Sequence, residues 1–182
     1  ITASLASWRA LLDAAREGTV NEAALAETQA RLGMARQLDA LYQTDAAIEQ
    51  LRAVLDAKPA KPAGAVAAAS LALGEGEDRL GHRDAAVAAY RLAIAAAPGT
   101  DTSGIRQRAG ERIRRAPDAR RAEAYRLSLE GLRTFEKGDG SGAEALLARS
   151  LQLDPKDPVA RYRYGRALHA RKEDAAALAA FE

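Results

Sequence analysis

The sequence predicts an all-α protein in which helical hairpins are repeated along the chain. The first observation is composition: 46 of the 182 residues are Ala, only 4% are aromatic and there is no Cys. Ala is the strongest helix former, and a chain without Cys can form neither disulfides nor Cys-ligated zinc sites. The second observation is that small residues, bulky residues and prolines return at fixed offsets in four segments. The third is that no apolar run approaches the ~18–20 residues of a membrane span, which excludes a transmembrane segment.

The first expected element is a helix from Ser4 to Arg16, within a region, 1–27, that also holds the start of the next helix. Its apolar stripe recurs at helical spacing and consists of Leu5, Trp8, Leu12 and Ala15. Gly18 follows as the stop signal. Because a repeat array needs a cover at its open end, we expect this helix to cap the first repeat.

Four segments then share one spacing, two of them in region 28–100 and two in region 124–182. The small residue in the middle of each first helix is Ala35, Gly74, Gly131 or Gly165. A second small residue follows twelve positions later, at Ala47, Ala86, Ala143 and Ala177. Four positions further on stands a bulky residue, Leu51, Tyr90, Leu147 or Phe181. Small side chains on both helices allow a close approach, and the bulky residue fills the remaining space between the helices.

Turn and cap residues mark the ends of the expected helices. Gly81 and Gly138 stand where a turn needs a positive φ. Asp84 and Ser141 are the expected caps of the helices that follow. Since proline cannot continue a helix, the second helices are expected to end at Pro59, Pro98 and Pro155.

This spacing resembles that of the tetratricopeptide repeat, a helix–turn–helix unit of 34 residues, and the resemblance covers most of residues 28–182. It implies a right-handed α-solenoid of about four helix pairs, in which each repeat buries its apolar face by stacking on its neighbours. Two copies depart from the family's pattern, because the large residue usual early in the first helix is Ser70 in one and Arg161 in another. We expect looser packing at these two positions.

The register breaks twice, and each break predicts an insertion. Pro59 and Pro98 are 39 residues apart, which leaves five extra residues near 60–64. Pro98 and Pro155 are 57 residues apart, which leaves a longer insert over 101–123.

The insert over 101–123 predicts one more short helix. Its apolar side recurs every four residues, at Ile105, Ala109 and Ile113. We expect Thr102 or Ser103 to cap this helix and Pro117 to end it. Because an unpaired helix between two repeats changes the stacking direction, we expect a kink or lobe boundary near Ala116-Pro117-Asp118.

The sequence contains no pattern typical of a catalytic, cofactor or metal site. The two histidines, His82 and His169, are far apart in sequence and are expected to be exposed. The acidic run from Gly74 to Asp78 falls at the predicted end of a first helix, where we expect a solvated turn and not a cation site. The sequence therefore predicts a protein that is not an enzyme and that binds no cofactor or metal.

An Arg-rich stretch lies between Ile105 and Arg126, where eight Arg face only three acidic residues. The candidate anion-binding patch consists of Arg106, Arg108, Arg112, Arg114, Arg115, Arg120 and Arg121. Such a run can bind phosphates with a salt-dependent affinity. However, Tyr125 is the only ring nearby, so the aromatic interleaving of nucleic-acid binders is nearly absent. We therefore favour a solvated surface, then an acidic protein partner, over nucleic acid or anionic lipid.

In the family that the chain resembles, the first helices line a concave groove that holds an extended peptide or a partner helix. The positions of the last two copies that would face this groove are Tyr125, Ser128, Leu129, Leu132, Phe135, Tyr162, Arg163, Arg166 and His169. Aromatic and Arg side chains are common in interface hot spots. Alternatively, Tyr125 and Tyr162 pack between helices or against the rest of the last repeat, and this alternative stays open.

One subgroup of the family grips a C-terminal carboxylate with Lys, Asn and Arg side chains at set groove positions. The matching positions here are Leu32, Arg36, Ala72, Tyr125 and Leu129. The clamp is not reproduced, so we do not expect the chain to bind a chaperone tail.

The resemblance therefore implies a protein–protein interaction scaffold whose groove binds a peptide or partner helix of unknown identity. Two alternatives stay open: binding of an anionic surface or nucleic acid through 105–126, and a regulatory repeat domain of a larger assembly. The last repeat stops at Phe181-Glu182, so we expect a fragment of a longer protein and self-association through this truncated repeat. We expect a soluble protein of the cytoplasm or the periplasm.

Overall fold

The computed structural model describes residues 2–57 and 62–181, and these residues form ten α-helices and no strand. The helices are α1 (Thr2–Arg16), α2 (Ala23–Ala40), α3 (Thr44–Asp56), α4 (Ala63–Arg79), α5 (Arg83–Ala96), α6 (Ile105–Arg114), α7 (Ala119–Glu136), α8 (Gly140–Leu153), α9 (Pro158–Ala170) and α10 (Asp174–Phe181). Neighbouring helices pack on one another, which confirms the prediction of an all-α helical-repeat fold. The right-handed sense of the solenoid stays a prediction.

The chain divides into two compact units, which are described separately below. Unit 1 comprises Ile1–Asp78 and His82–Ala116, and unit 2 comprises Arg79–Gly81 and Pro117–Glu182. The main boundary falls between Ala116 and Pro117, where the sequence predicts a lobe boundary. The change of stacking direction expected there, and the division of the chain into four regions, stay predictions.

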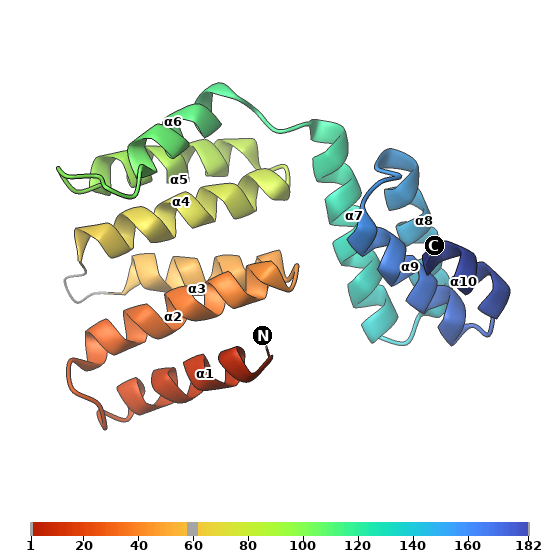
Figure 1. Cartoon of the computed structure of the whole chain (residues 1–182), viewed down its shortest axis with the longest axis horizontal. Coiled ribbons are helices and arrows are strands. Elements are labelled where there is room, and N and C mark those ends of the chain that lie inside the picture. The colour runs from red at the N-terminus through yellow and green to blue at the C-terminus, as the bar shows by residue number, and fades with distance from the viewer. Residues whose placement is uncertain (1, 58–61, 182) are drawn as a thin grey trace. The chain divides into compact units, whose positions relative to one another are not determined.

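In unit 1, helices α1 to α6 follow one another in chain order (Figure 1). One buried cluster joins α1, α2 and α3 to one side of α4, and it includes Leu12, Met34, Leu38, Leu51, Val54 and Ala69. A second joins the other side of α4 to α5 and α6, and it includes Leu71, Ala86, Tyr90, Ala93, Ile105 and Ala109. Each inner helix therefore buries two faces, one against each neighbour, as a repeat array requires.

The N-terminal helix is confirmed as α1, which ends at Arg16 just before Gly18 with its φ of 70°. Leu5, Leu12 and Ala15 of the predicted stripe are buried. The ring of Trp8 lies directly on Gly33 of α2, where any Cβ would overlap the indole. Gly33 is therefore the position that lets α1 lie close against α2.

The glycine contacts predicted from the repeat spacing are confirmed. A Cβ at Gly74 would overlap the ring of Tyr90, which is fully buried between α4 and α5. At Gly131, an added Cβ would lie 2.7 Å from Cγ of Leu147, which is fully buried on α8. At Gly165, it would lie 2.5 Å from Cε1 of Phe181. In all three pairs, the bulky residue of the second helix occupies the space that glycine leaves on the first.

The two departures from the repeat pattern differ from each other in the structure. Ser70 is fully buried in α4, and its hydroxyl has no hydrogen-bond partner among the described residues. Arg161 is exposed on α9 and donates to the carbonyl oxygen of Pro155 at 3.0 Å. The small side chain of Ser70 is thus enclosed by its neighbours, whereas Arg161 points to solvent.

The turn glycines are confirmed, but the predicted caps are wrong. Gly81 and Gly138 have φ values of 79° and 88°. Asp139 caps α8 by accepting a hydrogen bond from the backbone N–H of Gly142 at 2.8 Å, so Ser141 does not. Asp84 lies inside the first turn of α5, whose N-cap His82 makes no side-chain cap bond.

The prolines follow the second helices as expected. Pro98 comes directly after Ala97, the C-cap of α5, and Pro155 directly after Asp154, the C-cap of α8. Pro59 and the start of the five-residue insert lie outside the described residues, whereas its end, from Ala63, belongs to α4.

The short helix predicted in the insert is confirmed as α6, with Ile105 and Ala109 buried and Ile113 packed beside them. The predicted caps, Thr102 and Ser103, are wrong. The carboxylate of Asp101 instead accepts hydrogen bonds from the backbone N–H groups at the start of α6. The distances are 3.0 Å from Ile105 and 2.7 Å from Arg106. The helix ends at Arg114, ahead of Pro117.

Removal of the Asp101 charge should lower the stability of unit 1 in a pH-dependent way. The hydrogen bond from the Arg106 backbone N–H, helped by that from Ile105, lowers the pKa of Asp101. A carboxylate whose pKa is lower in the folded than in the unfolded state stabilises the fold at any pH above the unfolded-state pKa. This stabilisation is lost as the pH falls through the folded-state pKa. We therefore expect Asp101→Asn to lower the thermal midpoint at pH 7 but not at pH 2. Asp84→Asn is the control, and equal effects of both substitutions would contradict the capping role.

The acidic run from Gly74 to Asp78 is not a solvated turn, which corrects the prediction. Helix α4 continues through this run to Arg79, and the side chains of Glu77 and Asp78 are only 3% and 6% exposed. Buried carboxylates need charged or hydrogen-bonding partners, and both have them. Glu77 accepts from Arg52 at 2.6 Å and pairs with Nδ1 of His82 at 2.9 Å.

Asp78 belongs to a second buried group that fixes α6. Its two carboxylate oxygens both accept from Nη1 of Arg83, at 2.9 Å each, and one also accepts from the Tyr90 hydroxyl at 2.9 Å. Nη2 of Arg83 donates to the carbonyl oxygens of Arg112 and Ile113, at 2.9 and 2.7 Å. The guanidinium thus joins α4 to the C-terminal end of α6, where the partial negative charge of the helix dipole favours a cation.

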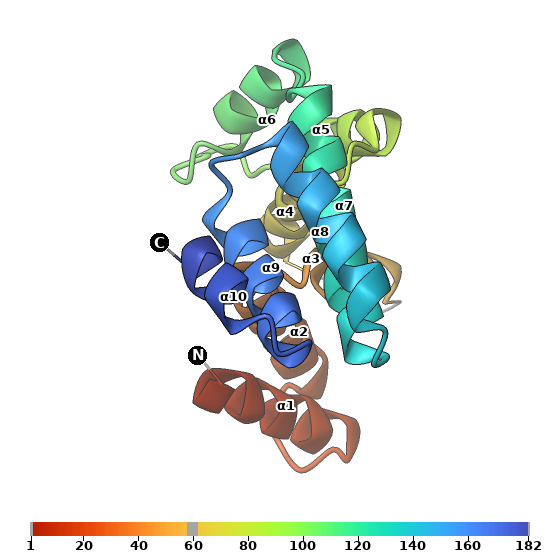
Figure 2. The same ribbon diagram turned by 90° about the vertical axis from the view of Figure 1, so that its right-hand side faces the viewer.

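Unit 2 contains the hairpin of α7 and α8, followed by α9 and α10 (Figure 2). Its core consists of Ala143, Leu147 and Ala167, with Phe135 and Tyr164 packed against it. The buried hydroxyl of Ser150 on α8 donates to the carbonyl oxygen of Ala124 on α7 at 2.7 Å. Helix α9 contacts both α8 and α7, so the first helices of the two repeats lie together.

Candidate binding surfaces

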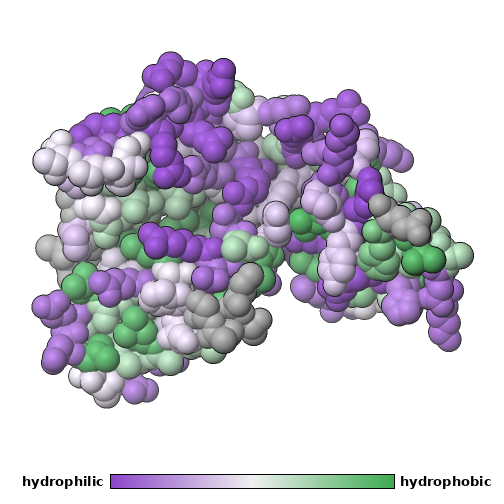
Figure 3. All heavy atoms as spheres, viewed as in Figure 1, coloured by the Kyte–Doolittle hydropathy of each residue, from purple (hydrophilic) through white to green (hydrophobic). Residues whose placement is uncertain are grey.

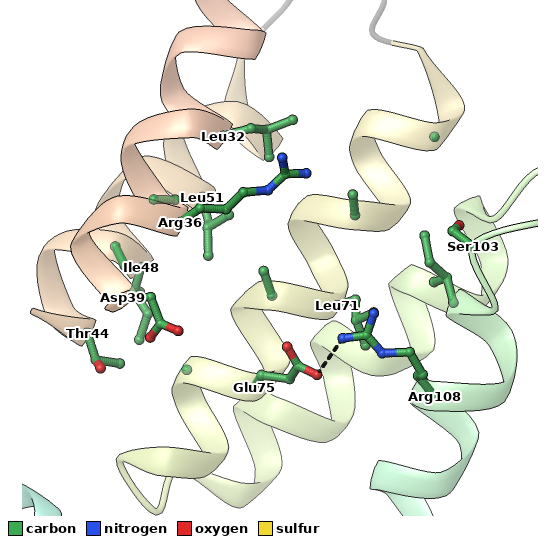
Figure 4. A pocket seen from close by; sticks show the side chains of 17 residues that line it. Leu32, Arg36, Asp39, Thr44, Ile48, Leu51, Leu71, Glu75, Ser103 and Arg108 are labelled. Atoms are coloured by element: carbon green, nitrogen blue, oxygen red, sulfur yellow. Dashed lines mark hydrogen bonds and ion pairs between the residues drawn. The ribbon is translucent and has the colours of Figure 1, made fainter. Parts of the chain in front are cut away.

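Unit 1 contains a hollow of about 430 Å³ on the face formed by the first helices (Figure 4). We call it the α4 hollow, because α4 forms its floor with Gly64, Ala68, Leu71, Ala72, Glu75 and Gly76. Helix α2 stands on one side with Leu32, Arg36 and Asp39, and α6 on the other with Ile105 and Arg108. The depression exists because most side chains along this face of α4 are small.

The bottom of the α4 hollow is apolar. Ile48 and Leu51 of α3 lie between α2 and α4 and, like Leu71, are buried. Gly76 keeps the backbone of α4 close to α3, since an added Cβ would lie 3.1 Å from Cγ1 of Ile48. Apolar side chains of a ligand would lose contact with water on entering such a site, which favours binding by about 25 cal/mol per Å² of apolar surface removed from water.

The rim of the α4 hollow is charged. The carboxylate of Glu75 accepts from Nη2 of Arg108 at 3.1 Å and lies 3.9 Å from Nη2 of Arg112. On the opposite side, Arg36 is exposed and pairs with none of the described acidic residues. Exposed ion pairs contribute little to stability, so these charges are free to orient a charged ligand above the apolar floor.

In unit 2, three of the predicted groove residues turn inward. Ser128 is fully buried, Leu129 is nearly so, and Arg163 is only 6% exposed. Nη1 of Arg163 donates to Oγ of Ser128 at 2.9 Å. This bond joins α9 to α7. The three buried residues therefore contribute to packing within unit 2 and do not belong to the proposed contact surface. Tyr125 and Leu132 are half-buried.

Of the remaining predicted residues, Tyr162, Arg166 and His169 are exposed and Phe135 is half-buried. The guanidinium carbon of Arg166 lies 5.2 Å from the ring centroid of Phe135 and 5.9 Å from that of Tyr162. The ring of Tyr162 in turn lies 5.9 Å from that of Phe181 on α10. His169 is exposed and pairs through Nδ1 with Asp174 at 2.8 Å.

One segment of unit 2 is similar to a known family. Residues 134–182, which run from the end of α7 to α10, match the tetratricopeptide repeat family. This segment of the chain is similar to tetratricopeptide repeats. No curated protein matches the chain in sequence. Tetratricopeptide repeats typically serve as protein–protein interaction scaffolds and are typically not enzymes, which agrees with the coarse function predicted from the sequence. The matched segment contains Phe135, Tyr162 and Arg166.

The Arg-rich stretch is divided between the two units. Arg106 to Arg115 belong to unit 1, where hydrophilic residues cover α6 (Figure 3), and Arg120 and Arg121 belong to unit 2. Arg106 donates to the carbonyl oxygen of Ala97, and Arg108 and Arg112 share Glu75.

The two Arg in unit 2 also have partners. Arg120 donates to the carbonyl oxygen of Gln152 at 3.1 Å, and Arg121 lies 3.7 Å from Asp154. Arg114 and Arg115 alone have no such partner among the described residues. Most of the predicted anion-binding patch therefore makes contacts within the protein, and its binding of anions stays a prediction.

The histidines and acidic residues form no candidate metal site within the described ranges. His82 is exposed, as predicted, and its partner is the buried Glu77. The prediction that the protein is not an enzyme and holds no cofactor stays a prediction. Among residues 2–57 and 62–181, no helix combines the length and the apolar character needed to span a bilayer.

Proposed function

We propose that this helical-repeat protein is an interaction scaffold that binds a segment of a partner protein, extended or helical, in the α4 hollow of unit 1. The observation that supports this most directly is the combination of an apolar floor on α3 and α4 with charged side chains on α2 and α6. Its volume of about 430 Å³ lies within the range of ~300–1,000 Å³ typical of ligand sites. A peptide can place apolar side chains on the floor and charged ones at the rim.

A peptide selection with a hollow-filling variant tests this function. Random peptides displayed on phage are selected against the full chain, and the best binders are synthesised. Ala72→Arg places a long charged side chain on the half-buried floor of the hollow, and we expect it to weaken peptide binding by about tenfold or more, equivalent to ~1.4 kcal/mol. Binding is measured by fluorescence anisotropy.

A matched control separates occupation of the hollow from a general effect of added charge. Ala88→Arg makes the same change at an exposed position of α5 that does not line the hollow. Its affinity for the selected peptides should equal that of the wild type. If no peptide is selected, or if Ala72→Arg and Ala88→Arg bind equally well, the α4 hollow is not the binding site.

The other functions raised by the sequence stay predictions with their own tests. Binding of DNA, RNA or anionic vesicles is measured at two salt concentrations, because phosphate binding must weaken as salt rises. Self-association through the last repeat is measured by light scattering over a range of protein concentrations.

A further inference from the structure

The Arg166 side chain in unit 2 is held in a fixed orientation by aromatic rings. It projects from α9 between Phe135 at the end of α7 and Tyr162 one turn earlier on α9, with its guanidinium carbon 5.2 and 5.9 Å from the two ring centroids. A guanidinium stacks on aromatic faces and keeps its N–H groups pointing outward in the plane of the fork. Two rings therefore restrict the rotation that an exposed Arg side chain otherwise has.

The donors of Arg166 are unused within the described part of unit 2. The residue is exposed, and it makes neither a hydrogen bond nor an ion pair with any described residue. A planar guanidinium matches a carboxylate through two parallel hydrogen bonds. Because the side chain is already ordered by stacking, less conformational entropy is lost when a carboxylate binds.

Apolar surface adjoins this cation. Tyr162, Leu178 and Phe181 are 57%, 62% and 47% exposed, and the rings of Tyr162 and Phe181 contact each other. We propose that Arg166 anchors an Asp or Glu side chain of a partner protein, and that an apolar side chain next to that acid packs on Tyr162 and Phe181. This inference rests on the proposed scaffold function but concerns a different surface.

The surrounding charges favour a single carboxylate over a nucleic-acid backbone. Nearby Arg171 is occupied by Ser141, Glu144 and Glu173, and Arg163 is buried. A phosphate backbone binds to several cations in succession, whereas this cluster offers one.

The test uses peptides selected from a random phage-displayed library against the full chain, with amidated C-termini so that only side chains carry acid. We expect a class of binders with Asp or Glu beside a bulky apolar residue. For these peptides, Arg166→Gln in the protein and Glu→Gln in the peptide should each weaken binding about tenfold, and the two changes together should add little. Arg149→Gln, at an exposed Arg of α8 that also has no partner among the described residues, should leave the affinity unchanged.

Each other outcome overturns the inference. If the acidic binders keep their affinity for Arg166→Gln, or lose it equally with Arg149→Gln, Arg166 is not the anchor, while the scaffold function stands on its binders to the α4 hollow. If only peptides with a free C-terminal carboxylate bind, or single-stranded DNA competes at equal affinity, the site has another ligand. If no peptide is selected, the scaffold function fails as well.

Discussion

Replacement of Tyr90 by Ala should lower the free energy of unfolding of unit 1 by about 3–5 kcal/mol, the range for large-to-small aromatic substitutions in a core. Tyr90 is fully buried, its ring fills the space that Gly74 leaves on α4, and its hydroxyl donates to Asp78 at 2.9 Å. Burial, together with that hydrogen bond, raises the pKa of Tyr90 above its ordinary value. Ala at this position leaves a cavity and removes a donor from a buried carboxylate.

The measurement is denaturant unfolding followed by fluorescence and by circular dichroism. Trp8 is the only Trp of the chain and packs on Gly33, so its emission reports on unit 1. Tyr90→Phe is the matched control because it keeps the ring and removes only the hydroxyl, at an expected cost of about 1–3 kcal/mol. Equal losses in the two variants would show that the ring itself does not fill the space beside α4.

The second large effect is expected in unit 2, where Leu147→Ala should cost about 2–5 kcal/mol. Leu147 is fully buried, and its Cγ would lie 2.7 Å from a Cβ added at Gly131. Gly131→Ala should also destabilise, by about 1–3 kcal/mol. This sign is opposite to the gain that Ala normally gives over Gly inside a helix, because the new methyl group overlaps Leu147.

The double substitution distinguishes this steric explanation from others. In the double variant, the methyl group at position 131 occupies part of the cavity left by Leu147→Ala. The double variant should therefore lose about 1 kcal/mol less unfolding free energy than the sum of the losses in the two single variants. Unfolding is followed by circular dichroism and by hydrogen exchange of the α7 and α8 amides. Additive losses would contradict a direct contact between the two positions.

Much of the fold follows from sequence because the repeat spacing encodes helix contacts directly. The twelve-residue and four-residue offsets identify pairs such as Gly165 and Phe181, and the structure shows these pairs in contact. The short insert helix was predictable from its apolar residues alone, since α6 buries Ile105 and Ala109. In each case the signal is local, so one stretch of sequence suffices to predict the element.

Cap residues and buried charges were less accessible to prediction. A residue two positions away can cap a helix equally well, as Asp139 does in place of Ser141, and helix ends are uncertain by that amount. The carboxylate of Glu77 is buried because Arg52, 25 positions earlier, reaches it. No local pattern shows such a pairing.

The candidate binding surfaces were likewise predictable only where they depend on the local repeat spacing. The repeat register predicts Phe135, Tyr162 and Arg166 on one surface, and the structure shows the Arg166 guanidinium beside both rings. The burial of Ser128 under Arg163 depends on how α9 packs on α7, across 35 residues.

The α4 hollow was not predicted from the sequence. Its floor is formed by small residues of α4 and one side by Arg108 of α6, which pairs with Glu75 although the two are 33 positions apart in the chain. Two signals pointed to the hollow: the run of Ala and Gly along α4, and the clamp-matching positions Leu32, Arg36 and Ala72, all of which line the hollow.

The packing of each helix on its neighbours in sequence also has a kinetic consequence. The packed helix pairs are adjacent in the chain or, as with α7 and α9, one helix apart. Contacts between nearby segments require the closure of only short loops, and chains with such low contact order fold rapidly. Because each helix packs mainly on its neighbours in the chain, one helix can open without disturbing distant ones. Helix α10 packs Phe181 on Gly165 and beside Tyr162, so opening of α10 would change the surface next to Arg166.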